Sequence, residues 1–343
     1  MQKEALVVSG ATGKAWRMVS DEGAYLAGYD AAPFPLSFMT AGMLASYTNG
    51  ITALASQRGI KLPGLRLTLD NYYTMEGSAL QGTMIGGALP PELTVVTDAD
   101  IDEETMKGFA AEAVRHSPID GLVRGVKGSL FTLTHNGAQI PVGRVSALSR
   151  PADSDPEAEF ERVEMSDAPL AGALIEKLRS AAEVEGAGGA NSSLQERQKR
   201  MLHVHGECTL RDDGVKEIEQ NLLKPLGSDF RYLSDEAPEF GGRGLAPDAA
   251  TYISAGVGFC FMTQFGRYAK IVKKPLDSYR IVQDTHFSAG GPGWADPVET
   301  HVYLNTGEDD DFARAALDMS EQTCFLHALC RTDLEPLIQI PSM

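Results

Sequence analysis

Basic residues, cysteines and long apolar runs are all scarce in this sequence, and each shortage excludes a class of protein. The 343 residues include 30 Lys and Arg against 47 Asp and Glu, a net charge of −17. An acidic chain without a local basic stripe repels phosphate backbones, so we expect no nucleic-acid partner. No apolar run approaches the ~20 residues of a membrane span, and the first ten residues contain no apolar signal core. We therefore expect a cytoplasmic protein with no membrane partner.

Cysteine is confined to the second half of the chain, at Cys208, Cys260, Cys324 and Cys330. Four cysteines are too few for a disulfide scaffold, and no CxxC pair indicates a structural zinc site. We expect neither a cofactor nor a metal. The length predicts about two domains, so a single domain would carry every thiol.

An internal repeat appears when the sequence is shifted by 214 positions. The tripeptide Ser20-Asp21-Glu22 then falls on Ser234-Asp235-Glu236, and 11 of the 43 positions from 13 to 55 are identical, against about three expected by chance. A second, weaker offset of 207 places the acidic run 102–104 on 309–311 and Ser117 on Cys324, with no identity around that cysteine. We interpret the chain as a diverged tandem duplication.

Each copy predicts the element order β–α–β–β–α, which is an α+β domain with helices packed against an antiparallel sheet. The long apolar stretches predict buried helices, and the alternating runs predict strands. The predicted helices are 37–58 and 251–270, with later helices running from acidic starts at 101–104 and 308–311 to Ser117 and Cys324; the predicted strands are 65–73, 92–97, 278–286 and 299–305.

The region between the copies predicts a hairpin and a linker. Residues 131–137 are typical of a strand entering an Asn-Gly turn. Residues 151–161 and 185–193 are typical of surface linker, with a short helix over 169–182 between them. The expected divisions are a first domain over 1–150, a linker over 151–199 and a second domain over 200–343.

Two cysteines stand where the first copy has serine. Cys260 corresponds to Ser46 and Cys324 to Ser117. Cys260 alone fits a buried core thiol in the middle of an apolar helix. Cys324 is predicted at a helix N-terminus, where the helix dipole is expected to lower the thiol pKa. Because both thiols differ from serine together, we interpret them as a functional pair.

These features resemble the OsmC/Ohr family (osmotically induced protein C and organic hydroperoxide resistance proteins). The resemblance lies in a central apolar helix with a mid-helix cysteine, preceded by SDE…GG…AP, and a second cysteine 64 residues later at a helix start. It covers roughly residues 1–125 and 200–343 and implies two OsmC-like α+β domains. The family's domain forms an intertwined dimer with active sites at the interface, so a tandem chain would form a pseudo-dimer by itself.

What the resemblance implies for function is thiol-dependent peroxide reduction, a thiol peroxidase-like activity. Cys260 would attack the O–O bond of an organic or small hydroperoxide and become a sulfenic acid, and Cys324 would condense with it to a disulfide. A dithiol reductant would restore the pair by exchange. The substrate is expected to be a small molecule, and the oligomeric state stays open, with a homo-oligomer among the expectations.

The sequence departs from the family at its charged residues. The family's Glu near the start of the central helix has no match, since Asp248 comes slightly too early. The family's Arg on an early strand, which holds the thiolate, has Arg17 and Arg231 as candidates shared by the two copies, with Arg243 in a Gly-rich loop. Without a fixed Arg and Glu, thiolate activation is not accounted for.

Two residues near Cys324 are further candidates. His327 follows by three positions on a helix and fits a base or cation over the thiol, or equally a histidine packed at a helix start. Cys330 follows by six, about 240° around the helix, and is expected to be a separate thiol.

Other motifs and other functions remain in view. His203 and His205 share one face of a predicted strand while Cys208 points away, which argues against a metal site. Residues 9–14 predict a hairpin turn, not a phosphate loop. Two alternative functions are left open: a cysteine nucleophile acting without a redox cycle on a small electrophilic or sulfur-containing substrate, and a non-catalytic protein that binds a hydrophobic ligand.

Overall fold

The computed structural model describes residues 2–26, 28–164, 170–181, 198–288 and 291–341, and its architecture is mixed α+β. The helices are α1 (Pro35–Arg58), α2 (Glu103–His116), α3 (Asp120–Val123), α4 (Glu157–Arg162), α5 (Ala249–Ile271), α6 (Asp310–Thr323) and α7 (Phe325–Cys330), with short 3-10 helices η1 (Ala24–Leu26) and η3 (Pro238–Phe240). Over these ranges, none of the helices combines the length and the apolar character that a membrane crossing needs.

The strands form two larger sheets and two hairpins. The eight-stranded sheet has the order β17 (Leu337–Gln339), β5 (Glu92–Val96), β3 (Arg66–Gly77), β10 (Gln198–Leu210), β11 (Lys216–Lys224), β12 (Asp229–Ser234) and β9 (Ile175–Arg179), with β4 (Ile85–Ala88) paired to β3. The five-stranded sheet has the order β13 (Ser278–Asp284), β16 (Glu299–Asn305), β6 (Leu130–His135) and β7 (Ala138–Ile140), with β8 (Ser146–Ala147) paired to β6. The hairpins are β1 (Lys3–Val8) with β2 (Ala15–Ser20), and β14 (Phe287–Ser288) with β15 (Trp294–Ala295). Both larger sheets combine strands from the two halves of the chain.

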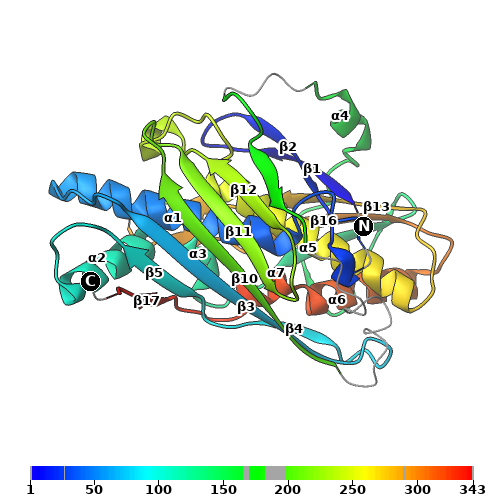
Figure 1. The fold of residues 1–343 in the computed structure, drawn as a ribbon. Coiled ribbons are helices and arrows are strands. Elements are labelled where there is room, and N and C mark those ends of the chain that lie inside the picture. Colours follow the sequence, from blue (N-terminus) through cyan, green and yellow to red (C-terminus); the bar gives the residue numbers. More distant parts are fainter. Residues whose placement is uncertain (1, 27, 165–169, 182–197, 289–290, 342–343) are drawn as a thin grey trace.

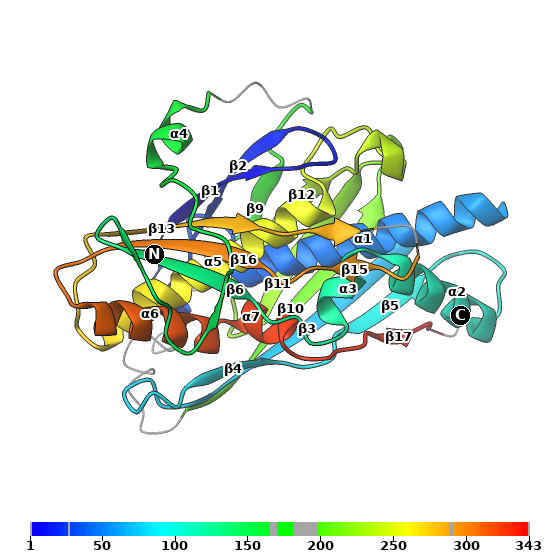
Figure 2. The same ribbon diagram turned by 180° about the vertical axis from the view of Figure 1, so that it is seen from behind.

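The helices α1 and α5 form the centre of the molecule. Figures 1 and 2 show them side by side, with the eight-stranded sheet over one side and β13, β16 and β6 over the other. Most of α1 and α5 is buried, which explains why their sequences are apolar nearly all round.

The two helices approach closely because each has a glycine at the crossing. A Cβ on Gly42 would lie 2.4 Å from Ile253, and one on Gly256 would lie 3.1 Å from the backbone nitrogen of Met39. Gly42 and Gly256 are separated by 214 positions, as are Met39 and Ile253. Each helix therefore places its glycine against the residue that lies at the matched position of the other helix.

Most predicted elements are confirmed, including the long helices, the strands after them and the two helices with acidic starts. Asp102 and Asp309 each cap such a helix by accepting a hydrogen bond from the backbone three residues on. The hairpin over 131–137 is confirmed as β6 and β7, with Asn136 and Gly137 in the left-handed region. The turn over 9–14 joins β1 to β2 as predicted, with a backbone hydrogen bond from Ser9 to Lys14.

Two predictions about the fold are wrong. The helix expected over 169–182 is absent from the described residues 170–181, which instead form β9 at the edge of a sheet because β12 offers an unpaired edge there. The helix of this region is α4, inside the acidic stretch predicted as linker; the stretch 185–193 lies outside the described residues. The sheets are also not purely antiparallel: β6 pairs parallel to β16 and β8, and β17 pairs parallel to β5. Of these strands, β6, β8 and β17 lie outside the repeated β–α–β–β–α unit, whereas β5 and β16 belong to it.

Candidate functional site

Two buried thiols from different elements meet beside the central helices. Cys260 lies in the middle of α5 and is 2 % exposed, while Cys324 lies between α6 and α7 and is fully buried. The two side chains interact, because the Cys260 thiol raises the pKa of Cys324, and all four cysteines are free thiols. The sequence therefore predicted a pair that the structure brings together. We call Cys260 and Cys324 the thiol pair.

The local backbone explains how Cys324 is placed. Cys324 ends α6 and caps α7, where its Sγ accepts a hydrogen bond of 3.5 Å from the backbone N–H of His327. The expected lowering of its pKa is wrong, however. Burial raises the pKa of the Cys324 thiol well above its usual value, contact with Cys260 raises it further, and the backbone N–H groups of α7 oppose this only in part. Cys324 is thus held as a protonated thiol.

His327 lies against Cys324, as the spacing of three residues suggested. Its Nδ1 is 3.1 Å from the Cys324 Sγ, and its ring packs between Phe131 and Phe261 at centroid distances of 5.7 and 5.3 Å. Burial in this aromatic setting, with the charge of Arg331 nearby, lowers the pKa of His327 to about 3. At neutral pH the ring is uncharged, so it can accept a hydrogen bond from the thiol but supplies no positive charge.

The predicted arginines lie elsewhere. Arg17 on β2 pairs with Glu4 at 2.8 Å and covers the ring of Phe160. Arg231 on β12 pairs with Glu176 at 2.6 Å and with Glu217 at 3.5 Å. Neither contacts the thiol pair. Arg243 binds the backbone carbonyl of Asp213 and is exposed. All three belong to surface ion pairs or loop contacts.

Two charged residues near the thiol pair, Arg267 and Glu22, were not predicted from the sequence. Arg267 lies on α5 seven residues after Cys260, two helical turns further along the same face. Burial lowers the pKa of Arg267, and the negative charges of Glu22 and of a Cys260 thiolate act against that lowering. The spacing i, i+7 on one helix could have identified Arg267.

A buried carboxylate from the first half of the chain completes this region. Glu22 Oε1 accepts hydrogen bonds from Thr263 Oγ1 at 2.7 Å and from Lys3 Nζ at 3.3 Å, and its Oε2 accepts one from Tyr25 at 3.1 Å. Thr263 lies on α5, one turn beyond Cys260. The Glu belongs to the SDE tripeptide that marked the repeat, but its contact with the other half of the chain could not be read from the sequence.

Cys330 is a buried free thiol separate from the thiol pair, as its helical angle suggested, and it lies in the same part of the core. The charges of Cys260, Cys324 and Cys330 all act on the hydroxyl of Tyr73, whose pKa burial raises strongly. Burial raises the pKa of Cys330 itself to about 12, and a charge on Cys260 adds to this. Three of the four thiols therefore share one region of the core.

The matched position in the first half holds two serines. Ser46 on α1 and Ser117 at the end of α2 form a hydrogen bond of 2.7 Å between their hydroxyl oxygens. We call them the serine pair. Ser117 lies three residues before the short helix α3 and does not cap it directly, unlike Cys324 at α7. The serine pair and the thiol pair join equivalent elements.

The thiol pair is covered by β4. A Cβ on Gly86 would lie 2.8 Å from the carbonyl oxygen of Thr323, so the strand backbone rests on the residue before Cys324. Gln322 donates hydrogen bonds to the carbonyls of Gly82 and Met84 beside this strand. A hollow of about 220 Å³ borders the same place. It is lined by Ile85, Arg144, Val145, Asp318, Glu321, Gln322 and Arg331.

The His203, His205 and Cys208 motif forms no metal site among the described residues. Asp70 on β3 lies between the two imidazoles, 2.5 Å from His203 Nε2 and 2.9 Å from His205 Nδ1. This contact raises the pKa of His205. Cys208 lies on the opposite face, buried against Thr48, where burial raises its pKa to about 11.

No family model matches the chain, and no curated protein matches it. Among solved structures, an organic hydroperoxide resistance protein OsmC from Legionella pneumophila is similar at 16% identity and a TM-score of 0.29, over 40% of this chain and 95% of that one. An OsmC-like protein from Mycoplasma pneumoniae is similar at 12% identity and a TM-score of 0.31, over 40% and 94%.

Proposed function

We propose that this protein reduces organic or small hydroperoxides through a dithiol–disulfide cycle of Cys260 and Cys324. The observation that carries the proposal is the contact between the two buried thiols, which belong to elements far apart in the sequence. A disulfide between them requires that their Cα atoms lie within about 7 Å of each other.

The cycle has three balanced steps. The Cys260 thiolate attacks the O–O bond of the hydroperoxide, forming a sulfenic acid and releasing an alkoxide that takes up a proton to become the alcohol. The Cys324 thiol then condenses with the sulfenic acid, forming the disulfide and releasing water. A small or protein dithiol reduces the disulfide by exchange and is itself oxidised to a disulfide. A reducing compartment such as the cytoplasm suits this last step.

The electrostatics favour Cys260 as the attacking sulfur. Arg267 interacts with a negative charge on Cys260, while burial and the Cys260 contact keep Cys324 protonated. The neutral ring of His327 lies with its Nδ1 3.1 Å from the Cys324 Sγ and holds that side chain in place beside its partner. Cys324 is therefore a hydrogen-bond donor to the thiolate first and the resolving thiol afterwards.

Access requires a local opening, because both sulfurs are buried. The hollow beside β4 lies at the junction of α6 and α7, next to Gln322 and Arg331. Movement of β4 away from Thr323 would join this hollow to the thiol pair. Arg331 ties the junction together through Glu321 at 2.7 Å and the Gly86 carbonyl at 3.1 Å. We propose this side as the entry for the peroxide.

We also propose that the chain is a tandem duplication folded as an intramolecular pseudo-dimer, with divisions at 1–150, 151–199 and 200–343. The element bounds support this. Shifted by 214, β1, β2 and α1 fall on β11, β12 and α5, and shifted by 207, α2 falls on α6. The reciprocal contacts at Gly42 and Gly256 are those of a two-fold interface, in which residue i meets j and j meets i.

Hydrogen bonds in the SDE segments give independent support. Ser20 and Ser234 each donate to the carbonyl of the proline 13 residues later, at 2.8 and 2.9 Å. Asp21 accepts from the backbone of residues 29 and 31, and Asp235 accepts from that of residues 243 and 245. The repeated tripeptide thus makes the same turn twice.

Peroxide titration with thiol counting tests the activity. The reduced protein should lose two thiols per chain, and peptide mapping should place a disulfide between Cys260 and Cys324. Cys208→Ser is the matched control, since this buried thiol contacts Thr48 and not the pair. Unchanged thiols after peroxide would contradict the proposal and favour cysteine chemistry without a redox cycle.

A further inference from the structure

A second cluster of ionisable side chains lies on the outer face of the five-stranded sheet. Glu299, His301 and Tyr303 alternate along β16 with Thr300, Val302 and Leu304, and the apolar Val302 and Leu304 belong to the core. The odd-numbered side chains therefore share the opposite face. Residues 150–157 cross that face: Tyr303 donates to the carbonyl of Asp153 at 2.7 Å, and Arg280 on β13 pairs with Asp155 at 2.7 Å.

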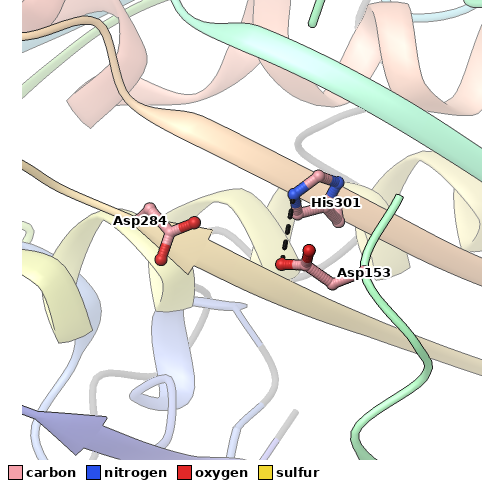
Figure 3. Close-up of side chains that lie close together, drawn as sticks. All are labelled: Asp153, Asp284 and His301. Atoms are coloured by element: carbon pink, nitrogen blue, oxygen red, sulfur yellow. Dashed lines mark ion pairs between the residues drawn. The ribbon is translucent and has the colours of Figure 1, made fainter. Parts of the chain in front are cut away.

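Three potential ligand atoms converge at this crossing. Asp153 from the crossing segment, Asp284 from the end of β13 and His301 from β16 place one ligand atom each within 4.8 Å of the others, and no other such group occurs over the described residues. Figure 3 shows the carboxylate of Asp153 facing the His301 ring, with Asp284 beside them. The separation of His301 Nε2 from Asp153 Oδ2, 3.4 Å, equals the distance of about 3.4 Å between two ligands on a tetrahedral zinc ion.

The imidazole of His301 is positioned in the way that a metal-ligating histidine is. His301 is fully buried, and its Nε2 has no hydrogen-bond partner. Its Nδ1 lies 2.7 Å from the hydroxyl of Thr132 on β6. This contact fixes the ring orientation, and the hydroxyl oxygen can accept a hydrogen bond from the Nδ1–H group. A metal-ligating histidine is held in this way by a partner on its other nitrogen.

The negative charges around His301 outnumber the positive ones, which favours the binding of a dication. The charges acting on His301 are those of Asp153, Asp284, Glu299 and Arg150. Arg150 pairs with all three carboxylates, at 2.9, 2.5 and 3.0 Å respectively to Asp153, Asp284 and Glu299. Three negative charges thus share one guanidinium, and a net charge of −2 remains.

We propose that Asp153, Asp284 and His301 bind a divalent transition metal ion, Zn²⁺ in the first place. One imidazole and two carboxylates form a donor set that suits zinc, and a water molecule would complete a tetrahedron on the exposed side of Asp153. Arg150 stays with Glu299 while the ion takes its place between the two aspartates. The ion would fasten the crossing segment 150–157 to the sheet that covers α5.

Metal titration of the whole, reduced, chelator-treated chain tests the site. We expect one Zn²⁺ per chain by calorimetry, with affinity lowered at least a hundredfold, about the upper limit for loss of a supporting partner alone, in His301→Asn and Asp284→Asn. His203→Asn, in the separate cluster around Asp70, is the matched control and should bind as the wild type does. Absence of binding in the wild type, or an affinity equal to that of the wild type in both ligand variants, would overturn the proposal.

Spectroscopy distinguishes this site from the thiols. Co²⁺ in place of Zn²⁺ should give ligand-field bands without a thiolate-to-metal charge-transfer band, and X-ray absorption of the zinc form should show only nitrogen and oxygen neighbours. A sulfur shell would overturn the assignment. Circular dichroism checks the fold of each variant, and if His301→Asn does not fold, Asp284→Asn decides, because Asp284 is half-buried and already on the sheet edge.

Discussion

The thiol pair and the serine pair have the same frame and different chemistry. Ser46 and Ser117 join the central helix α1 to the end of α2 by a hydrogen bond of 2.7 Å, and Cys260 and Cys324 join α5 to the end of α6. Oxygen can hold the two elements together as well as sulfur can, but it cannot be oxidised to a disulfide. The frame therefore accounts for the fold, and two side chains account for the redox capacity we propose.

The residues around the thiol pair also differ from those at the matched positions around the serine pair. At the position of Arg267 the first half has Ala53, and at the position of His327 it has Asp120. Asp120 forms an ion pair with Arg124, whereas His327 contacts Cys324 at 3.1 Å. The half with the thiols thus has a cation whose pKa responds to a charge on Cys260 and a neutral ring beside Cys324, and the matched positions of the other half have neither.

The largest effect is expected from making the two pairs alike. Cys260→Ser should lower the rate of peroxide-dependent thiol loss by about a thousandfold or more, since the nucleophile is removed. The matched change in the first half, Ser46→Cys, should leave the rate as it is, because Ala53 supplies no cation there. Stopped-flow measurement of peroxide consumption in both variants checks this. A rate retained in Cys260→Ser would contradict the assignment of the nucleophile.

The next effect concerns stability in acid. His327 has a pKa of about 3 when folded and about 6.5 when exposed, so the unfolded chain binds the extra proton between these values. The stability contributed by the neutral ring is present above about pH 6.5 and is lost as pH falls toward 3. His327→Phe keeps the stacking on Phe131 and Phe261. Between pH 7 and 4.5, the free energy of unfolding of this variant should fall by about 2–3 kcal/mol less than that of the wild type.

Denaturant unfolding at a series of pH values measures this effect. His135, which contacts the exposed Asp310 at 2.6 Å, provides the matched variant His135→Phe. Equal acid sensitivity in wild type and His327→Phe would show that the buried ring is not the cause.

Much of the fold was predictable because its signals are local. The long apolar runs predicted α1 and α5. The acidic starts predicted α2 and α6, each of which is capped by an aspartate. The thiol pair was predictable from the comparison of Ser46 and Ser117 with their counterparts. The strand β9 was not, because an edge position next to β12 depends on tertiary pairing and not on the propensity of residues 175–179.

Which charged residues lie near the thiol pair could not be predicted from the sequence. Arg17 and Arg231 looked equivalent because both copies share them, yet both pair with surface acids. Glu22 reaches α5 from 241 positions away, a contact that only the fold creates. The direction of the Cys324 pKa was wrong for a related reason: the cap at α7 was foreseen, but the burial that outweighs it was not.

Replacing Arg267 by the residue at its matched position sharpens the comparison further. Arg267→Ala reproduces Ala53 and should slow thiolate-dependent oxidation of Cys260 about tenfold near neutral pH, because a nearby cation shifts a thiol pKa by about one unit or more. The pH profile of the rate should move to higher pH, and the rate at alkaline pH should approach that of the wild type. Arg231→Ala, on the surface, is the matched control and should leave the profile in place. An unshifted profile in Arg267→Ala would remove this residue from the mechanism.

The smallest expected effect separates the two glutamates of the SDE tripeptides. Glu22 is held by Lys3 and Thr263, whereas burial raises the pKa of Glu236 to about 7. A carboxyl with a raised pKa in the folded state contributes stability below about pH 4.5, and that contribution is lost as pH rises through 7. The free energy of unfolding of Glu236→Gln should therefore rise by at least about 1 kcal/mol relative to the wild type on going from pH 5 to pH 8.

Glu22→Gln should show no such gain and should lose stability at both pH values, because it gives up the ion pair with Lys3. Chemical unfolding of both variants at the two pH values measures the difference, and parallel behaviour would mean that the two acids lie in equivalent settings after all.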